Sequence, residues 1–397
     1  MMANIAKIVN NLMKLLIVGS GPIGSILANC LAEHDLDIVV VDKVSPAESL
    51  TAEYDGRTSA ISRGSFNFLN SVGLGQLLID EGAPINQIHV SDQKSHNFVD
   101  FDAKYDGAPM GYIIENRNFR QYLYDHISHK PNVKLIAPAT VEDLQFNNNG
   151  VTANINGEKY RFDLCIAADG RNSITRDTAG ITTQSWPYDQ TAFVSVIEHT
   201  LPHDNIAFEH FTTSGPIAFL PMNGNKSSLV WSINNIAADD LDSLTNEEFC
   251  EVLQSRFGNY LGDLKITNRL WKYPLSAQYA KSYFATRLAL AGDAAHSIHP
   301  VAGQGLNLGI RDCETLNQLI KDQINLGLDI GSKVMLEKYQ KQRMFDNATM
   351  LGITDTLVNA YSNSNPILGF IRSQALGVAN AIPPLKKLMM KHATGTL

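Results

Sequence analysis

The sequence is poor in cysteine, and its four cysteines form no C-x-x-C pair. They stand far apart, at Cys30, Cys165, Cys250 and Cys313. We therefore expect no zinc or iron–sulfur site, and free thiols suit a reducing compartment. No apolar run reaches about 18 residues, the length that spans a bilayer. The N-terminal stretch has two lysines before the first apolar run and no small-residue cleavage site, which predicts neither a secretory signal nor an Arg-rich transit peptide.

Positive charge is in deficit, with a formal net charge of −8 at pH 7. A nucleic-acid partner needs a basic face for its phosphates, so this balance argues against one. The 397 residues, 44% of them hydrophobic, exceed the length at which a single core keeps growing. We therefore expect two interleaved lobes, in a protein that is soluble or peripheral to a membrane.

A glycine-rich motif follows the first apolar run. Residues 14–18 (KLLIV) predict a strand, GSGPIG follows, and SILANCLAEHDL has a helical pattern. In such a strand–turn–helix unit Gly19 allows the tight turn, Gly21 lets a pyrophosphate approach the backbone, and Gly24 lets the helix pack on the strand. The phosphate then lies at the helix N-terminus, where free N–H groups favour an anion.

The next predicted strand, DIVVVDK, supplies a carboxylate for the same ligand. It ends in Asp42, 18 residues after Gly24, close to the roughly 20 expected for the acid that accepts the ribose hydroxyls. Together the two segments favour dinucleotide binding over an ordinary structural turn. They do not distinguish FAD from NAD.

Two later segments carry the same pattern of an apolar strand that ends in an acid. DLCIAADGRNS (163–173) delivers Asp169 to the carboxyl end of a strand, although an Asp-Gly pair alone is typical of a simple turn. In RLALAGDAAHSIHPVAGQGLNLGIRD (287–312) a strand ends in Gly292 and Asp293, and a helix begins near Gly305. Asp293 is placed to accept hydrogen bonds from hydroxyls such as those of a ribityl chain.

The glycine turn of the last segment lets the backbone approach a flat ring. The N-terminus of the helix, which is the positive end of its dipole, points at the same ring. A reduced flavin is an anion, so this dipole favours it by about 0.3–1 kcal/mol. His296 and His299 in the same segment are alternatively metal ligands or plain loop residues. We expect no metal, because no third ligand with suitable spacing stands nearby.

Together GSGPIG, AADGRNS and GDAAH resemble the three FAD fingerprints of the single-component flavin monooxygenases, the group that includes para-hydroxybenzoate hydroxylase. Within that group HPVAGQGLNLGIRD (299–312) matches the signature of the ubiquinone-biosynthesis hydroxylases. The likeness extends to about residue 345. It includes DGRTSAISRGS, which looks like the family's arginine-bearing segment, and YIIENRNFRQYL, which looks like its cleft loop and helix. Three further stretches look like the family's substrate lobe: YDQTAFV, GPIAFLP and LVW.

The resemblance implies roles for individual residues. The predicted FAD-binding set is Gly19, Gly21, Gly24, Asp42, Arg57, Arg117, Asp169, Gly292, Asp293, Pro300, Gly303, Gln304, Gly305, Leu306 and Asn307. The family more often has Glu where this chain has Asp42, so we expect a less direct ribose contact. For Arg57 and Arg117 the alternative is a solvated surface arginine. Asp169 is expected between FAD and nicotinamide, and the segment from Pro300 to Asn307 over the isoalloxazine.

The resemblance also implies the reaction. FAD is reduced by NADH or NADPH, and O2 then forms a flavin C4a-hydroperoxide that hydroxylates an electron-rich phenol ring. The chain has no second GxGxxG, so the nicotinamide cofactor is expected to bind transiently in the shared cleft. No protein nucleophile is needed, and no base for the phenol stands out. Tyr188 and His299 are weak candidates for that base, and each is more often structural.

The predicted fold is α/β, with a Rossmann-like FAD-binding domain interleaved with a mixed or antiparallel β-sheet substrate domain and a helical C-terminus. The FAD-binding domain is expected at 1–84, 113–180 and 278–335, and the substrate domain at 85–112 and 181–277. Residues 336–397 form the C-terminal helical segment, with breaks at Pro366 and at 383–384.

The last 30 or so residues carry apolar side chains interleaved with Arg372, Lys386, Lys387 and Lys391, and no acid follows Asp355. This basic amphipathic character suits the inner face of a bacterial plasma membrane, where a polyprenyl substrate resides. A helix packed on the body or on a partner, such as another ubiquinone-biosynthesis protein, fits the pattern equally. We expect a cytoplasmic protein with peripheral membrane contact.

Two other functions remain open. One is a different flavin enzyme of this fold, such as a prenyl reductase or an epoxidase. A halogenase is disfavoured, because the W-x-W-x-I-P motif is absent and Trp231 is followed by Ser-Ile-Asn. The other is a non-catalytic FAD-binding scaffold in a multi-enzyme complex. The complete GQGLN turn argues against a scaffold, which has no need to complement a reduced flavin.

Overall fold

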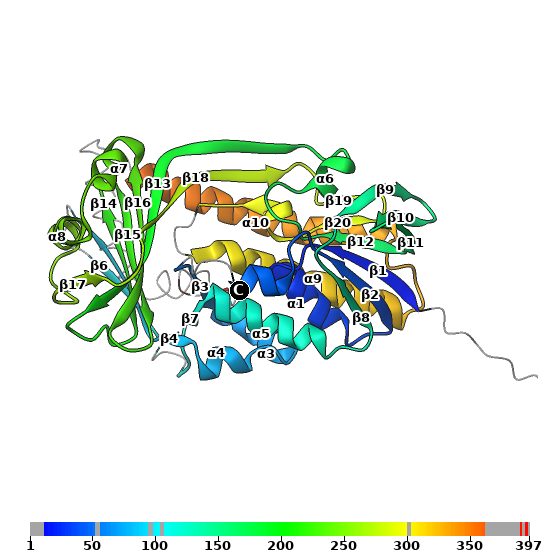
Figure 1. The fold of residues 1–397 in the computed structure, drawn as a ribbon, viewed down its shortest axis with the longest axis horizontal. Coiled ribbons are helices and arrows are strands. Elements are labelled where there is room, and N and C mark those ends of the chain that lie inside the picture. The colour runs from blue at the N-terminus through cyan, green and yellow to red at the C-terminus, as the bar shows by residue number, and fades with distance from the viewer. Residues whose placement is uncertain are drawn as a thin grey trace, which may run out of the picture.

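A computed structural model describes residues 12–51, 56–93, 98–103, 107–299, 303–361, 390 and 394–395. Two sheet systems lie at opposite ends of an elongated molecule, and long strands and a helix run between them (Figure 1). This arrangement confirms the predicted α/β class with a second, largely antiparallel sheet.

The first system is a six-stranded sheet, here called the parallel sheet. Its order is β19 (Phe284–Ala285), β20 (Leu288–Leu290), β12 (Leu164–Ala167), β1 (Met13–Val18), β2 (Leu36–Val41) and β8 (Val133–Ile136). All neighbours are parallel except β19 and β20. Its central strands are continuous apolar runs because both faces of a parallel sheet are covered.

Helices α1 (Pro22–Leu31), α5 (Asn116–Ser128) and α9 (Gln304–Asn325) pack together on this sheet, and α10 (Lys333–Tyr361) lies against α9. A three-stranded sheet of β9 (Val141–Asn147), β10 (Gly150–Ile155) and β11 (Glu158–Phe162) joins the same core. It contains two hairpins, with turns at 148–149 and 156–157. All four cysteines are buried free thiols.

The second system is a nine-stranded sheet, here called the wide sheet. Along its main path lie β21 (His296–Ser297), β18 (Trp271–Ala280), β13 (Thr183–His199), β16 (Lys226–Asn234), β15 (Gly215–Met222), β14 (Ile206–Thr212), β5 (Gln87–Asp92) and β6 (Phe98–Asp102), and β17 (Leu264–Ile266) pairs with β13. Only β14 and β5 are parallel neighbours. Helices α7 (Asn235–Asp242) and α8 (Asn246–Phe257) cover its outer face over an aromatic core.

A small sheet of β3 (Thr58–Ser62), β7 (Gly111–Glu115) and β4 (Ala83–Ile85) lies between the two systems. The remaining short helices are α2 (Pro46–Thr51), α3 (Arg63–Ser71), α4 (Gln76–Asp80) and α6 (Ile174–Thr178), and α6 lies near the parallel sheet. The strands β13 and β18 extend from the wide sheet to the parallel sheet (Figure 1). Tyr279 of β18 pairs with His296 of β21, so the wide sheet reaches the turn that follows β20.

Helix α10 confirms helical structure after residue 331 as far as Tyr361. Pro366, Pro383 and Pro384 and the basic residues Arg372, Lys386, Lys387 and Lys391 lie outside the described residues. Within the part of the chain that the structure describes, no helix is long and apolar enough to cross a membrane.

Candidate functional site

The carboxyl ends of β1, β2, β12 and β20 meet at one edge of the parallel sheet. Backbone hydrogen bonds fix their relative positions there: the N–H of Gly19 donates to Val41 at 2.7 Å, and that of Ala291 donates to Ala167 at 2.9 Å. Because parallel strands end at the same edge, the three motifs come together although they are far apart in the sequence. This edge is where ligands bind in open α/β sheets.

The three glycines of the first motif have different surroundings. A side chain on Gly19, which has φ +103°, would meet the Ala168 carbonyl oxygen at 2.3 Å, and one on Gly24 would meet the Gly19 carbonyl oxygen at 1.9 Å. Nothing lies within 4 Å of the position that a Cβ of Gly21 would take. Gly21 is the N-cap of α1, and no side chain caps that helix. The open backbone and uncapped N–H groups fit a pyrophosphate.

Asp42, at the end of β2, is tied to the same turn. One carboxylate oxygen accepts from the Ser20 amide at 2.6 Å and the Ser20 hydroxyl at 2.9 Å, and the other accepts from the Val44 amide at 2.9 Å. A carboxylate has about four acceptor positions, so one remains for a ribose hydroxyl. The ribose contact stays a prediction, and the bonds to Ser20 are a second role that spacing alone does not reveal.

Two further carboxylates at this edge have unused acceptor capacity. Oδ2 of Asp169 accepts from the Thr175 amide at 3.1 Å, whereas Oδ1 is buried with no hydrogen-bond partner in the described part of the protein. Asp293 is surrounded by protein, and this burial raises its pKa despite nearby His296 and Arg171. The residue is nevertheless exposed to solvent. Both residues fit a ligand rich in hydroxyl groups, such as FAD.

The N-terminus of α9 faces the same region. Gly303, its N-cap, has φ +61°, a left-handed conformation that glycine adopts without strain, and no side chain caps the helix. A Cβ on Gly305 would meet nothing within 4 Å, whereas Gln304 is buried. Asn307 clamps α9 to β3: its amide donates to the Ala60 carbonyl at 2.8 Å and its oxygen accepts from the Ser62 amide at 2.9 Å. Leu306 is partly buried in the main core.

Pro300, which was predicted to cover the isoalloxazine, lies outside the described residues. For the residues from Gly303 to Asn307 flavin contact stays a prediction. The exposed backbone at Gly305 and the uncapped helix fit a flat anionic ring, because its charge would lie at the positive end of the helix. The clamp by Asn307 was not foreseen, since its partners on β3 are far away in the sequence.

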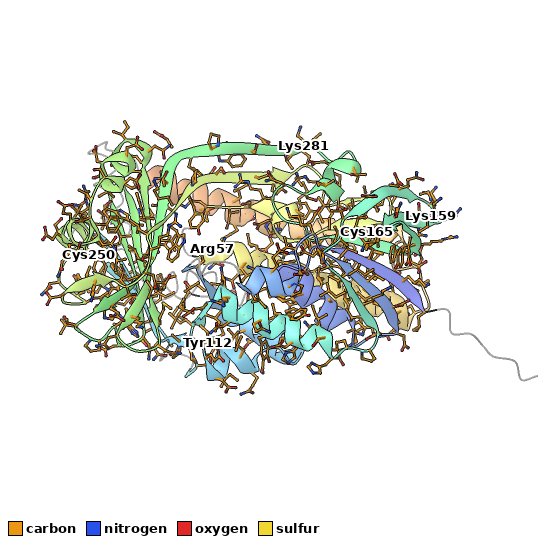
Figure 2. The ribbon with its side chains drawn as sticks, in the orientation of Figure 1. Arg57, Tyr112, Lys159, Cys165, Cys250 and Lys281 are labelled. Atoms are coloured by element: carbon orange, nitrogen blue, oxygen red, sulfur yellow. The ribbon has the colours of Figure 1, made fainter. Side chains whose placement is uncertain are left out.

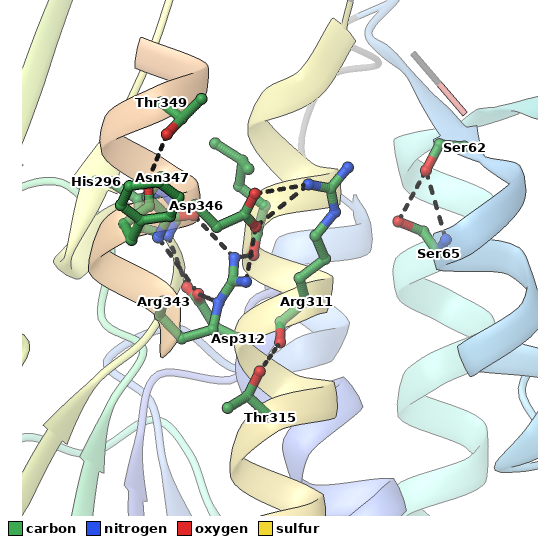
Figure 3. A network of polar contacts seen from close by, with 12 residues as sticks. Ser62, Ser65, His296, Arg311, Asp312, Thr315, Arg343, Asp346, Asn347 and Thr349 are labelled. Atoms are coloured by element: carbon green, nitrogen blue, oxygen red, sulfur yellow. Dashed lines mark hydrogen bonds and ion pairs between the residues drawn. The ribbon is translucent and has the colours of Figure 1, made fainter. Parts of the chain in front are cut away.

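A buried polar network centred on Asp312 (Figure 3) supports the Gly292–Asp293 turn. His296 Nε2 lies 2.6 Å from Oδ2 of Asp312, and the Gly292 amide donates to the same oxygen at 3.0 Å. Arg343 of α10 donates through Nε to Oδ1 of Asp312 at 2.7 Å and to the Asn347 side chain at 2.8 Å. His296 therefore supports the turn. Within the described residues no group of His, Cys, Asp and Glu side chains could hold a metal ion.

A cavity of about 280 Å³ lies between the wide sheet and the small β3–β7–β4 sheet. One part of its lining comes from the start of β3, the loop after β12 and the start of α5, and these residues are polar. The wide sheet and Ile298 supply the rest, which is mostly apolar with some hydroxyl groups. The lining residues are Arg57, Thr58, Asn116, Arg171, Ala192, Val194, Ser228, Val230, Tyr273, Pro274, Leu275, Ser276, Ser297 and Ile298. The Arg57 guanidinium lies 5.6 Å from the centre of the Tyr273 ring. Figure 2 shows Arg57 between the two sheet systems. Arg117 is exposed and is not part of this lining.

The two weak candidates for a base contact each other. The rings of Tyr188 and His299 meet edge to face with centroids 4.9 Å apart. The Tyr188 hydroxyl donates to Asp355, and His299 Nε2 lies 2.9 Å from Oε1 of Gln190. Burial, followed by the contact with Asp355, raises the pKa of Tyr188, and burial lowers the pKa of His299 to about 4. At neutral pH Tyr188 is therefore a protonated donor and His299 a neutral, weak base.

The fold and this edge define a flavin-dependent oxidoreductase. The FAD binding domain family matches residues 13–346. Ubiquinone hydroxylase UbiL of Rhodospirillum rubrum is 41% identical over 96% of this chain and 90% of its own length. The 3-demethoxyubiquinol 3-hydroxylase of Escherichia coli is 32% identical over 96% of this chain and 98% of its own. The chain belongs to the FAD binding domain family and, within it, to the ubiquinone-hydroxylase group of FAD-dependent monooxygenases.

A solved structure shares the overall fold. The crystal structure of Pseudomonas aeruginosa PqsL in complex with 2-aminobenzoylacetate has a TM-score of 0.79 and covers 91% of this chain and 99% of its own. Sequence identity is 20%, so this likeness concerns the fold alone. Family membership confirms the expected FAD cofactor and monooxygenase class, whereas the individual site residues rest on the geometry described above.

Proposed function

We propose that this protein hydroxylates the aromatic ring of a polyprenyl-phenol intermediate of ubiquinone biosynthesis, with NADH or NADPH as reductant and O2 as oxidant. The names of the related hydroxylases support the pathway. The observation that carries the proposal is the cavity, which joins an apolar wall to two arginines beside the edge that fits FAD. A lipophilic ring with one polar substituent matches such a lining.

FAD, when bound, supplies electron transfer from the nicotinamide cofactor and the activation of O2. In this proposal Gly21 and the N-terminus of α1 hold the pyrophosphate, and Asp42 the adenosine ribose. Asp293 accepts from the ribityl hydroxyls, and the N-terminus of α9 stabilises negative charge on the reduced ring. Asp169 lies between the cofactor and the site for nicotinamide.

The cavity residues position the substrate and keep water out. Val194, Val230 and Leu275 of the wide sheet form an apolar wall for the ring and the start of the prenyl chain. Arg57 lies beside Tyr273 in the polar part of the lining, where its positive charge is proposed to face the flavin. Exclusion of water strengthens these interactions because the local dielectric is low. Arg117, which is exposed, is proposed to contact FAD from outside this cavity.

The test is a turnover assay with the FAD-loaded protein, NADH or NADPH, and geranylphenol as a short-chain probe. We expect substrate-stimulated oxidation of the nicotinamide cofactor and a product that carries one oxygen atom from labelled O2. Stimulated oxidation without oxygen incorporation would indicate a reductase or another flavin enzyme. The absence of any stimulation, with FAD bound, would indicate a scaffold. Either result rejects the proposed reaction.

We further propose that residues 1–84, 113–180 and 278–335 form the FAD-binding domain and 85–112 and 181–277 the substrate domain. Residues 336–397 are proposed as the C-terminal helical segment and as the part that contacts a membrane or a partner.

Attraction to anionic lipid is about 1 kcal/mol per basic residue near the surface. Replacement of Lys386, Lys387 and Lys391 with Glu should reduce sedimentation with anionic liposomes and leave FAD content unchanged. Undiminished sedimentation would assign the segment to packing or to a partner.

A further inference from the structure

The inner face of the wide sheet carries one carboxylate in an otherwise apolar row. The row runs across five strands through cross-strand partners: Val90 of β5, Glu209 of β14, Ala218 of β15, Val230 of β16 and Val194 of β13. Partners in register point to the same face of a sheet. Since Val194 and Val230 line the cavity, Glu209 lies on the cavity side of the sheet.

Glu209 lies on the same wall as the cavity, beyond the residues that line it. Two strand spacings of about 4.8 Å separate it from Val230, so about 10 Å along the wall lie between them. The small side chain of Ala218 lies between them, so it leaves room for a ligand above the sheet at that point. The Glu209 side chain is only partly buried, so a ligand that extends from the cavity along the wall can reach it.

Among the residues that the structure describes, no partner explains the Glu209 carboxylate. In the described part of the chain, Glu209 forms neither a hydrogen bond nor an ion pair. Burial raises its pKa to about 7, and burial is the sole cause of the shift. No described ionisable group is among the causes of this shift: Asp92, Glu198 and Lys226 lie on the same face of the sheet, Tyr273, Arg57 and Arg171 line the cavity, and Asp355 lies on the adjoining helix. A half-buried acid with no partner among the described residues costs stability there, which is typical of a residue kept for function.

We infer that the Glu209 carboxylate binds a ring hydroxyl of the substrate and removes its proton during turnover; this inference rests on the proposed hydroxylation. The phenolic O–H bond breaks, the proton bonds to a Glu209 oxygen, and the electron pair stays on the phenolate oxygen. The ring thereby becomes more electron-rich before it is oxidised. The Glu209 acid returns the proton to solvent when the product leaves.

Glu209 suits this role better than Tyr188 or His299. A phenol has a pKa of about 10, and the closer a base lies to that value the less the transfer costs, at about 1.4 kcal/mol per pKa unit. Burial brings Glu209 to about 7, whereas His299 is held at about 4. The Tyr188 hydroxyl is already engaged with Asp355 as a donor.

The test compares Glu209→Gln with the parent protein and with Glu198→Gln. Glu198 is a matched control on the same sheet, partly buried and paired with Lys226 at 3.2 Å. The probes are geranylphenol and its methyl ether, which lacks the hydroxyl proton. We expect Glu209→Gln to lower kcat for hydroxylation of geranylphenol by about 100-fold or more, the usual effect of removing a general base. FAD content and thermal stability should not fall.

Two further readouts separate a catalytic role from a structural one. The parent kcat/KM should rise with pH and level off above about 7, and this limb should disappear in Glu209→Gln. The parent should prefer geranylphenol to its methyl ether, and Glu209→Gln should lose most of that preference. Parent-like turnover and an unchanged pH profile in Glu209→Gln would overturn the role of Glu209 alone. A parent protein that yields no hydroxylated product would overturn the proposed function and this role with it.

Discussion

His296 and Asp312 form a buried contact in which Nε2 lies 2.6 Å from Oδ2, and neither side chain has appreciable exposed surface. His296 follows the Gly292–Asp293 turn, whereas Asp312 lies inside α9. The same carboxylate accepts from the Gly292 amide and from Arg343. The turn that carries Asp293 is thus attached to two helices through one carboxylate.

Asp312 should therefore be important for stability. Removal of one partner from a buried ion pair leaves an uncompensated charge and costs about 3–5 kcal/mol. Because Arg343 also contacts Asp346 at 2.7 Å, we expect Asp312→Asn to lower the free energy of unfolding by about 3 kcal/mol, the low end of that range. Denaturant unfolding measures this free energy, and Asp346→Asn, at a more exposed carboxylate, is the control. A loss equal to that of the control would contradict this assignment.

The same carboxylate predicts a dependence of stability on pH. Burial acts to raise the pKa of Asp312, but His296 and Arg343 outweigh it, and the pKa lies below its ordinary value of 3.8. A group whose pKa is lowered by folding stabilises the protein above its unfolded pKa, and that contribution is lost as pH falls through the folded pKa. The parent should therefore lose stability more steeply below about pH 4 than Asp312→Asn. Parallel curves would reject this.

Substitutions at Gly21 and at Gly24 should have different effects, the first on FAD binding and the second on stability. Gly21 has an ordinary φ of −60° and open space around it, so Gly21→Leu should fold with a stability within about 0.5 kcal/mol of the parent. The added side chain fills the space proposed for the pyrophosphate, and the protein should be purified without flavin absorbance. Gly24→Ala places a methyl group 1.9 Å from a carbonyl oxygen and should lose about 1–3 kcal/mol through strain. A folded Gly21→Leu with stoichiometric FAD would contradict the proposed pyrophosphate site.

Asp293→Ala should weaken FAD binding without unfolding the protein. A charge-assisted hydrogen bond contributes about 1.5–3 kcal/mol, so the Kd should rise roughly ten- to a hundredfold. Because the Asp293 side chain is accessible, its removal leaves no buried cavity. Fluorescence titration of the apoprotein with FAD measures the change. Asp242→Ala, which removes an exposed partner of Lys272, is the control, and an Asp293→Ala titration that matches it would remove Asp293 from the site.

The parts of the site that could be predicted are those fixed by short sequence spacing. A strand, a glycine turn and a helix are adjacent in the chain, and parallel strands end at one edge, so Gly21, Asp169 and Asp293 were placed at that edge from pattern alone. The Rossmann-like sheet and the antiparallel second sheet follow from the same periodicity.

The parts that could not be predicted depend on long-range packing. Asp312 and Arg343 meet only because α9 and α10 lie side by side, and no local pattern encodes that approach. Glu209 looks like an ordinary solvent-facing residue of a strand until the cross-strand register places it on the cavity side. Tyr188 and Asp355 are 167 residues apart, and their contact explains why a tyrosine that resembles a base is instead a donor.

Tyr188 should contribute to the stability of the fold and should take no part in proton transfer. Its pKa is raised by burial and then by the hydrogen bond to Asp355, so the hydroxyl stays protonated across the neutral range. Tyr188→Phe removes this bond, and the half-buried Asp355 then lacks its donor, which should cost about 1–2 kcal/mol of stability. The ring contact with His299 is retained, since phenylalanine keeps the edge-to-face geometry.

We therefore expect Tyr188→Phe to melt at a lower temperature while kcat for hydroxylation of geranylphenol stays within a few-fold of the parent and its pH profile is unchanged. The same assay run on Glu209→Gln provides the contrast, because there kcat should fall and stability should hold. The two variants thus separate loss of a buried hydrogen bond from loss of a base. If Tyr188→Phe instead lost about 100-fold in kcat with an unchanged melting temperature, Tyr188 would be the group that touches the substrate, since removal of a general base has that magnitude.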